Sequence, residues 1–482
     1  MRLRTILCCS ALVLAAACSG TPAATTPPDV PPDCARPVSP SALSGAQVLV
    51  HGSHTAGDTV SFTVPPGTGS LTIVHQAQNA NLKVVFNGTV VDNSAVPGVI
   101  LKPDGSKAYD DNDPAFGAPS SPDGGTDPSG IYGFFGGGSP STSAFTIPNT
   151  SASLDAGVPS GTWQFQVNDY AYECAQPNSG CSDGGASGNT YDVMVLVKPA
   201  PPATPTLDLA FYIVANVIDP PPPLGTGHTG TGTQFTAANA VSDPSAQRMV
   251  STFTSLYSSV GIKIGKVTFY DVDPAAVTRF GTSINADTTG PCDELDQMFL
   301  LSAAHPGNTL NLFLVQSITS KSSSGGSVVG IDGTIPGPAT LSGTVHSGAA
   351  VSLADLFRGA SNCTGGPDLS CGADEVAFIG AHEAGHFLGL FHTTEADGRD
   401  FDPLTDTAKC PCISCAKSTD LPNCSTGGSS SNPIFLASDQ CSGVSAACGG
   451  GDNLMFWQLG SASLGKLTPQ QAAVMSLSPV VH

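Results

Sequence analysis

The chain has 482 residues, more than one hydrophobic core usually organises, so we expect two folded domains. Its 38 acidic and 17 basic residues give a net charge of −21, which disfavours nucleic acid and anionic lipid as partners. With 55 glycines, 40 prolines and only 6% aromatic residues, the composition predicts many short strands and few long helices.

Residues 1–17 have the features of a secretion signal peptide. Arg2 and Arg4 precede an apolar run that is too short to span a membrane. The residues before Cys18 resemble a bacterial lipobox, although Ala15 stands where that motif usually has leucine. The resemblance implies a lipoprotein in which a lipid on Cys18 is the only membrane contact. The alternative is an ordinary signal peptide cleaved after an A-x-A sequence.

Residues 18–40 are rich in proline and threonine and predict an extended tether. The chain has 15 cysteines, of which Cys8, Cys9 and Cys18 would be removed or lipidated. An even number remains, which predicts disulfide bonds in an exported chain, so Cys34 is expected to be paired. The protein is therefore expected at the cell surface or outer membrane, or secreted.

Residues 41–198 predict an all-β domain. Alternating apolar and polar residues recur between turns rich in Gly, Pro, Asn and Asp, which favours an antiparallel β-sandwich. Such runs are DTVSFTV, SLTIVH, LKVVFNG, GTWQFQVNDY and YDVMVLVKP. Cys174 and Cys181 could staple one loop, and the acidic stretch Tyr109–Pro114 is interpreted as a polar turn rather than a Ca²⁺ loop.

Residues 199–206 form a Pro-rich linker to a second domain, which we place at 207–482. This domain begins with alternating strand and helix patterns, so the chain is expected to be multidomain, with the β-sandwich followed by an α/β (α+β) domain.

Several elements of the second domain can be placed from local patterns. Residues 207–218 and 309–318 predict buried strands. A helix is expected from the N-cap Asp243 to Gly261, with an apolar stripe on one face. A bulge near Gly265 would bring the apolar residues of the next strand back into phase.

The stretch AHEAGHFLGLFH, residues 381–392, lies in an expected helix from Glu375 to about Leu388, with Asp374 as its N-cap. His382 and His386 are one turn apart, so both rings leave the same face and can bind one Zn²⁺. Glu383, beside the first histidine, would reach a water on the metal without being a ligand.

Gly389 follows the second histidine by three residues and can adopt a positive φ, which ends the helix in a sharp turn. The turn would bring His392 to the same ion from another direction. Three histidines would then leave the fourth tetrahedral position to water, as in a catalytic zinc site. Gly380 and Gly385, inside the helix, are interpreted as positions of close packing.

HEAGHFLGLFH resembles the HExxHxxGxxH signature of the metzincin zinc peptidases. Metzincins also have a methionine turn beneath the metal, and this resemblance assigns that structural role to Met455 in DNLMFWQLG. The NLM turn, the capped helix start at Thr468 in LTPQQAAVM and the stretch LTDT are similar to the pappalysin-type metzincins.

The sequence departs from the pappalysin pattern in three places. Trp457 stands two residues after the methionine, where that group usually has a tyrosine that could help to stabilise an oxyanion. Ala408 follows LTDT instead of proline, and Glu395 comes soon after the third histidine.

Two further groups of residues could bind metal. Cys410, Cys412 and Cys415 have a metal-ligand spacing, but disulfide bonds are favoured in an exported protein. An acidic segment could bind Ca²⁺ through oxygen ligands or be a solvated loop; its carboxylates are Asp397, Asp400, Asp402 and Asp406. His346 is interpreted as a surface residue, and its segment, GTVHSGAAVSL, as the edge strand that pairs with substrate.

Together these features predict a monomeric zinc endopeptidase that acts on proteins or peptides. Zn²⁺ on the three histidines would lower the pKa of its water to near 7, and Glu383 would be the general base. One alternative is a surface-anchored binding lipoprotein built on an inactive protease fold. Another is an adhesive lipoprotein in which residues 41–198 carry the function.

Overall fold

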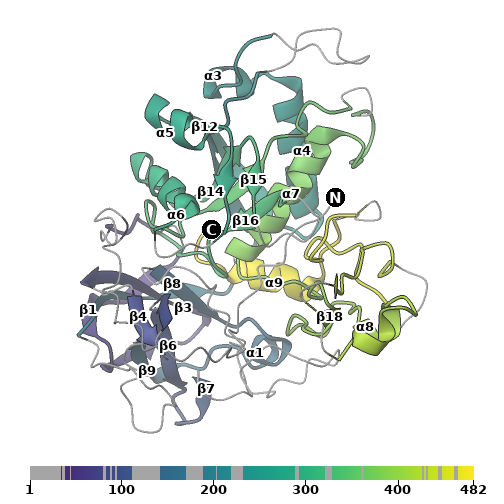
Figure 1. Ribbon diagram of the computed structural model, residues 1–482. Helices are drawn as coiled ribbons and strands as arrows, with labels where there is room; N and C mark the ends of the chain where they lie inside the picture. The colour runs from purple at the N-terminus through teal and green to yellow at the C-terminus, as the bar shows by residue number, and fades with distance from the viewer. Residues whose placement is uncertain are drawn as a thin grey trace, which may run out of the picture.

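The computed structural model describes residues 34, 38–43, 45–79, 83–86, 89–92, 95–110, 142–169, 188–201, 203–218, 232–287, 292–320, 328–359, 363–425, 428–429, 432–442, 448–460 and 465–482 (Figure 1). It is a mixed α/β structure in which sheets predominate, several of them antiparallel. The predicted signal peptide, Cys18, nearly all of the tether, Cys174 and Cys181, and the end of the Tyr109–Pro114 stretch lie outside the described residues.

Two four-stranded antiparallel sheets pack face to face in the N-terminal part, as expected for a β-sandwich. In β2, Val60, Phe62 and Val64 are buried and alternate with exposed residues, which is the period of a strand with one face in a core. The first sheet consists, in order, of β1 (Gln47–Thr55), β10 (Thr190–Pro199), β3 (Thr68–Asn79) and β8 (Thr142–Ile147). The second consists of β2 (Thr59–Val64), β9 (Gly161–Asp169), β6 (Ala95–Leu101) and β7 (Lys107–Asp110).

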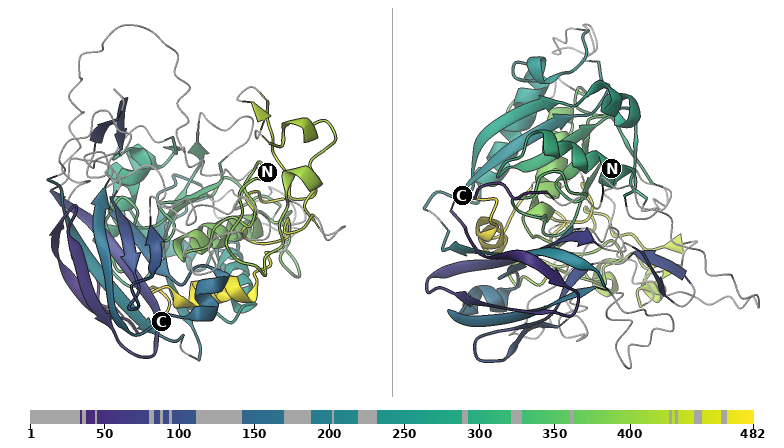
Figure 2. Two further views of the ribbon diagram at one scale, coloured as in Figure 1. Left: turned by 90° about the horizontal axis from the view of Figure 1, so that it is seen from below. Right: turned by 90° about the vertical axis from the view of Figure 1, so that its left-hand side faces the viewer.

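A hairpin of β4 (Lys83–Phe86) and β5 (Thr89–Asp92) and the short helix α1 (Ser151–Ala156) complete this part. The first sheet is also covered on its outer face. Four apolar side chains point away from the sandwich core and join the hydrophobic core of the C-terminal half: Val74, Ala144, Met194 and Leu196. The two halves of the molecule therefore pack together across this sheet (Figure 2).

The C-terminal half is built on a five-stranded sheet in which four strands are parallel and the edge strand β16 is antiparallel. Its order is β12 (Lys263–Asp271), β11 (Thr206–Ile213), β14 (Leu310–Val315), β17 (Ala349–Ser352) and β16 (Gly330–Asp332). Strands β13 (Ile284–Asn285) and β15 (Ile318–Thr319) pair separately. The first strand ends at Ile213, earlier than the predicted Ile218, whose side chain is exposed.

The predicted bulge is present. Two residues of β12, Gly265 and Lys266, face the single residue Asp208 of β11. The Lys266 N–H donates to the Asp208 carboxylate at 2.6 Å, and a Cβ on Gly265 would lie 2.2 Å from that carboxylate. Glycine is therefore required where the carboxylate fills the bulge.

Helices cover both faces of this sheet (Figure 1). In β11, Leu209 and Phe211 share a core with α4 and α7, whereas Ala210 and Tyr212 share a core with α5 and α6. The helices are α3 (Ala237–Ala240), α4 (Pro244–Ser258), α5 (Pro274–Phe280), α6 (Glu294–Phe299), the 3₁₀ turn η2 (Leu300–Ala304) and α7 (Gly372–Phe387). The result is a three-layer α/β/α arrangement.

Helix α4 begins as predicted, because the Asp243 carboxylate accepts a hydrogen bond from the Ala246 N–H. Helix α7 begins three residues earlier than predicted, with Cys371 at its N-cap. The prediction that Asp374 caps this helix is wrong. Asp374 is fully buried in the first turn, where its carboxylate accepts from Arg248 Nε of α4 at 2.7 Å. The Asp374 carboxylate therefore pairs with an arginine of the neighbouring helix instead of accepting from the N–H groups at the start of α7.

The chain after α7 is mostly irregular and is held by disulfide bonds. Its elements are α8 (Cys412–Cys415), the 3₁₀ turn η4 (Leu421–Asn423), the hairpin of β18 (Gly428–Ser429) and β19 (Asn432–Pro433), and α9 (Pro469–Leu477). Three bonds cross this segment: Cys410–Cys441, Cys412–Cys424 and Cys415–Cys448. The C-x-C-x₂-C stretch is therefore a disulfide framework, as favoured from the sequence.

Two more disulfide bonds, Cys34–Cys292 and Cys363–Cys371, lie elsewhere. Cys34 is paired, as the even number of cysteines predicted. Disulfide bonds in this number are typical of proteins that fold outside the cytosol. Within the described part of the chain, no helix has the length and apolar character needed to cross a bilayer.

Candidate metal centre

Three histidine side chains converge at the C-terminal end of α7. The Nε2 atoms of His382 and His386 are 3.0 Å apart. The Nε2 atom of His392 lies 3.3 Å from that of His382 and 3.2 Å from that of His386. Gly389 ends the helix with a φ of +104°, and this turn brings His392 back toward the helix. Nitrogens at about 2.05 Å from a shared tetrahedral ion would be about 3.3 Å apart, close to the observed spacing.

The other nitrogen of each ring, Nδ1, faces a hydrogen-bond acceptor. His382 Nδ1 lies 2.6 Å from the Leu454 carbonyl oxygen, and His386 Nδ1 lies 2.7 Å from that of Leu390. His392 Nδ1 lies 3.1 Å from each carboxylate oxygen of Glu395. Because main-chain carbonyl oxygens only accept, the Nδ1 atoms of His382 and His386 carry the proton, and their Nε2 atoms face the Nε2 of His392.

Burial favours the neutral, metal-binding form of two of these rings. Burial first, and then the neighbouring histidines, lower the pKa of His382 to about 3 and that of His386 well below its usual value. The spacing of the three Nε2 atoms, together with these two neutral rings, fits a metal ion. Within the described part of the chain, no other set of three or more His, Cys, Asp or Glu side chains is placed to share an ion.

Glu383 is buried between α7 and the edge strand β16. A Cβ on Gly330 of β16 would lie 2.3 Å from Glu383 Oε1, so glycine is needed for this approach. Burial first, and then the charge of Asp332, raise the pKa of Glu383 well above its usual value, while the main-chain N–H of Asp332 donates to it and opposes the rise. A cation beside this carboxyl group would lower its pKa again.

Asp332 is a member of the site that the sequence did not indicate. Its side chain is buried, and burial raises its pKa to about 7, an effect that the nearby His392 opposes. No spacing or motif identifies it, because β16 is three residues long and lies 51 positions before Glu383.

The predicted methionine turn lies under the histidines. Met455 is fully buried, its N–H donates to the Asn453 side chain, and its carbonyl oxygen accepts from the Thr393 N–H at 2.9 Å. The preceding residue, Leu454, supplies the carbonyl that holds His382. The turn therefore bonds His382 on the helix and also Thr393, the residue after His392. Trp457 is also buried, and its indole N–H donates to the Leu436 carbonyl oxygen at 2.7 Å.

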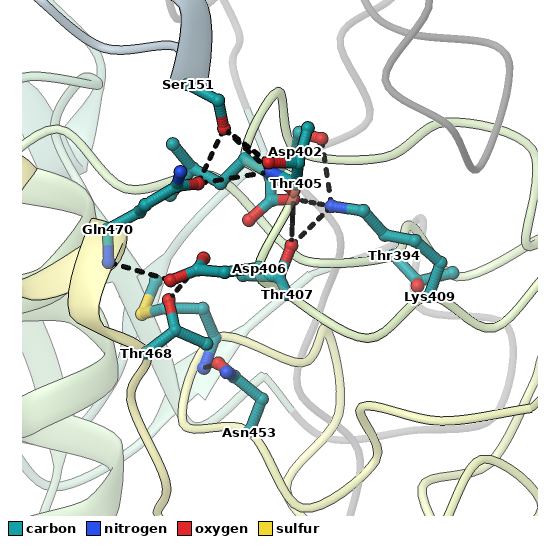
Figure 3. A network of polar contacts seen from close by, with 12 residues as sticks. Ser151, Thr394, Asp402, Thr405, Asp406, Thr407, Lys409, Asn453, Thr468 and Gln470 are labelled. Atoms are coloured by element: carbon teal, nitrogen blue, oxygen red, sulfur yellow. Dashed lines mark hydrogen bonds and ion pairs between the residues drawn. The ribbon is translucent and has the colours of Figure 1, made fainter. Parts of the chain in front are cut away.

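The LTDT stretch fixes the loop after His392 to the C-terminal helix (Figure 3). The Asp406 carboxylate accepts from Thr468 Oγ1 at 2.7 Å and from the Gln470 N–H at 2.8 Å, at the start of α9. The Thr405 N–H donates to Ser151 Oγ of α1 at 2.8 Å. This network joins the loop to both halves of the molecule.

The aspartates considered for Ca²⁺ do not form one site. Asp402 is buried and pairs with Lys409 and Thr407, whereas Asp406 binds the start of α9 (Figure 3). Asp397 accepts from the Arg399 N–H. Asp402 and Asp406 therefore hold different parts of the loop, whereas Asp400 lies near Asp397, whose charge adds to the effect of burial in raising the pKa of Asp400.

The expectations for His346 and its segment are wrong. His346 is buried, and its Nδ1 bonds the carbonyl oxygen of Thr142 in β8. The strand in this segment, β17, lies between β14 and β16, so it is internal and β16 forms the edge. The edge strand nevertheless lies beside the histidines, through its contact with Glu383.

A hollow opens beside His382, between α7 and the residues around the methionine turn. Its walls are mostly apolar and include Phe378, Ile379, Leu454, Phe456 and Leu459.

Comparison with known proteins does not identify the chain. No protein-family model matches it, and no curated protein does. Similar solved structures include an active-site mutant of a family two carbohydrate esterase from Clostridium thermocellum, with 7% identity over 56% of this chain and a TM-score of 0.12. Another is a Bacillus subtilis protein, with 10% identity over 53% of this chain and a TM-score of 0.12.

The chain spans 65% and 46% of these two structures, less than two thirds of either. A TM-score this low does not indicate a shared fold.

Proposed function

We propose that this protein is an exported zinc-dependent endopeptidase of the metzincin type. The observation that carries the proposal is the convergence of three histidine Nε2 atoms beside the buried carboxyl group of Glu383. Three features support the proposal: the helix that carries two of the histidines, the turn at Gly389 and the position of Met455 against Gly385. By its sequence motifs the chain resembles the pappalysin-type metzincins. The disulfide bonds agree with an exported protein.

His382, His386 and His392 would hold the ion, which supplies Lewis acidity and a lowered pKa for water when bound. Glu383 would take the proton of the attacking water on its carboxylate and pass it to the leaving amine. Its burial favours this role, because a carboxyl group with a raised pKa is a stronger base when ionised.

The proposed substrates follow from the strand edge beside the site. The edge strand β16 can pair with an extended chain, as in other cases of strand addition. The substrates would thus be proteins or peptides outside the cell. Lipidation of Cys18 would hold the enzyme at the membrane.

The direct test is the Glu383→Gln variant, with Asp155→Asn on the exposed side of α1 as the control. We expect wild type and the control to cleave an unfolded protein substrate. Both should lose this activity when a chelator is added and recover it when zinc is restored. The Glu383→Gln variant should bind one zinc per chain and cleave at least about a thousandfold more slowly. Cleavage by Glu383→Gln at the wild-type rate would contradict the proposal.

One observation favours the alternative of a binding lipoprotein on an inactive protease fold. Trp457 is held by Leu436, so no phenol stands at that position to assist an oxyanion. Zinc binding by the wild type with no cleavage of any member of a broad peptide library would support this alternative.

A further inference from the structure

His392 differs from the other two histidines in the group that holds its outer nitrogen. His382 and His386 bind main-chain carbonyl oxygens, whereas His392 binds the carboxylate of Glu395 through both oxygens at 3.1 Å. Among these three partners, only Glu395 supplies a charged side chain, and His392 is the ligand that does not belong to the helix. The ring whose position is not set by α7 is therefore the one with a carboxylate partner.

A tight turn places Glu395. Its N–H donates to the Asp400 carbonyl oxygen at 2.9 Å, and its own carbonyl oxygen accepts from the Gly398 N–H at 2.8 Å. Thr394 and Phe401 form an isolated antiparallel bridge at the base of this turn. The main chain at Glu395 is thus fixed on both sides.

Two hydrogen bonds attach this turn to the segment that the three disulfide bonds after α7 cross-link, here called the disulfide framework. The Cys410 N–H donates to Thr394 Oγ1, and the Cys412 N–H donates to the Gly398 carbonyl oxygen, both at 2.9 Å. Cys410 and Cys412 are each in a disulfide bond. The packing is close, because a Cβ on Gly398 would lie 2.4 Å from Leu436 Cδ1. This cross-linked framework gives a loop residue a defined position beside His392.

We propose that Glu395 is a positioning residue for the metal site. Its carboxylate orients the His392 ring and increases the electron density on Nε2, which strengthens the bond to a divalent cation. The inference rests on the proposed metal-binding role of the histidines. It also assigns a role to the disulfide framework, which holds this carboxylate in place.

The test measures zinc affinity by competition with a chromogenic chelator, using the complete exported chain with its disulfide bonds intact. Glu395→Ala should bind zinc 10–100-fold more weakly than wild type, and Glu395→Gln, which keeps an acceptor but not the charge, should lie between them. The control is Asp397→Asn, which removes a negative charge from the same turn at a residue whose carboxylate accepts from the Arg399 N–H rather than from a histidine ring. It should stay within about threefold of wild type.

Two further readouts separate positioning from general structural damage. With chelator present, the thermal midpoints of the Glu395 variants should equal that of wild type, and the visible spectrum of bound Co²⁺ should shift in the variants alone. Wild-type zinc affinity in both Glu395 variants, or an equal loss in Asp397→Asn, would overturn the inference and leave the proposed function standing. Failure of the wild type itself to bind zinc would overturn both.

Discussion

Gly385 of α7 lies directly against Met455. A Cβ on Gly385 would be 2.5 Å from the Met455 Sδ and 3.2 Å from its Cε. Alanine is the better helix former by about 1 kcal/mol, so the glycine is unfavourable for the helix itself. Its place is explained by the methionine, which needs that space to support the turn that holds His382.

Gly385→Ala should therefore destabilise the protein and weaken its metal site. The added methyl group must displace the methionine sulfur, at a cost of about 1–3 kcal/mol for overpacking. The displacement would also move the Leu454 carbonyl away from His382. Urea unfolding in the presence of a chelator measures the first effect, and zinc titration measures the second.

Gly380→Ala in the same helix is the matched control. The sequence suggested close packing at both glycines, but a Cβ on Gly380 would meet nothing nearer than Phe253 at 3.7 Å. This change should raise the free energy of unfolding by up to about 1 kcal/mol through helix propensity. A loss of stability in Gly380→Ala equal to that in Gly385→Ala would show that the contact with Met455 is not the cause.

Lys198 should be important for the packing of the two halves. It is buried at the end of β10, and its ammonium group donates to three main-chain carbonyl oxygens at the C-terminus, those of Ser476, Ser478 and Val481. Lys198→Met would leave these acceptors buried without a donor and should cost about 1–3 kcal/mol in unfolding free energy.

Lys263→Met, at an exposed position of β12, serves as the control for this change and should stay within about 0.5 kcal/mol of wild type. Equal urea unfolding midpoints for the two variants would mean that the hydrogen bonds of Lys198 to the C-terminal carbonyl oxygens contribute nothing to stability.

His346 should contribute to the loss of stability in acid. Burial lowers its pKa from 6.5 to about 4, an effect that its bond to Thr142 opposes. Below pH 6.5 the unfolded chain therefore binds a proton that the folded chain does not, and stability falls as the pH falls until about pH 4. This single group should account for roughly 2 kcal/mol of loss between pH 7.5 and 5.0.

The measurement compares unfolding free energies at these two pH values, with chelator, in wild type and His346→Gln. Glutamine can still donate to the Thr142 carbonyl oxygen but does not titrate. The variant should lose about 2 kcal/mol less than wild type between the two pH values. Identical losses would indicate that the pKa of His346 is the same in the folded and unfolded chains, so that burial does not lower it.

The histidine cluster could be predicted because it depends on local sequence. The three histidines and Glu383 lie within eleven residues, and the helix period and one glycine determine where their rings meet. The alternation in strands such as β2, the capping of α4 and the bulge at Gly265 also depend on neighbours in sequence. The structure agrees with each of them.

The failed predictions concern residues whose partners are distant in sequence. Asp374 looked like an N-cap, but Arg248, 126 positions earlier, binds it. His346 looked exposed, but Thr142, 204 positions earlier, bonds its ring. A single sequence gives no sign of such contacts, because burial and ion pairing at these sites arise when separate elements pack together.

Glu395 is an intermediate case. It was noticed only as a departure from the pappalysin pattern, although it lies three residues after His392. The spacing permits a bond to the ring, but the bond depends on a turn that the disulfide framework holds. A carboxylate within a few residues of a ligand histidine is the signal that could have identified it.

The proposed function requires that three imidazoles hold one zinc ion. X-ray absorption at the zinc edge, on protein loaded with one equivalent of zinc, measures this coordination. We expect three histidine nitrogens at about 2.0–2.1 Å and one further oxygen or nitrogen ligand in a four-coordinate site. A first shell containing sulfur at about 2.3 Å, or one unchanged by His386→Ala, would contradict it.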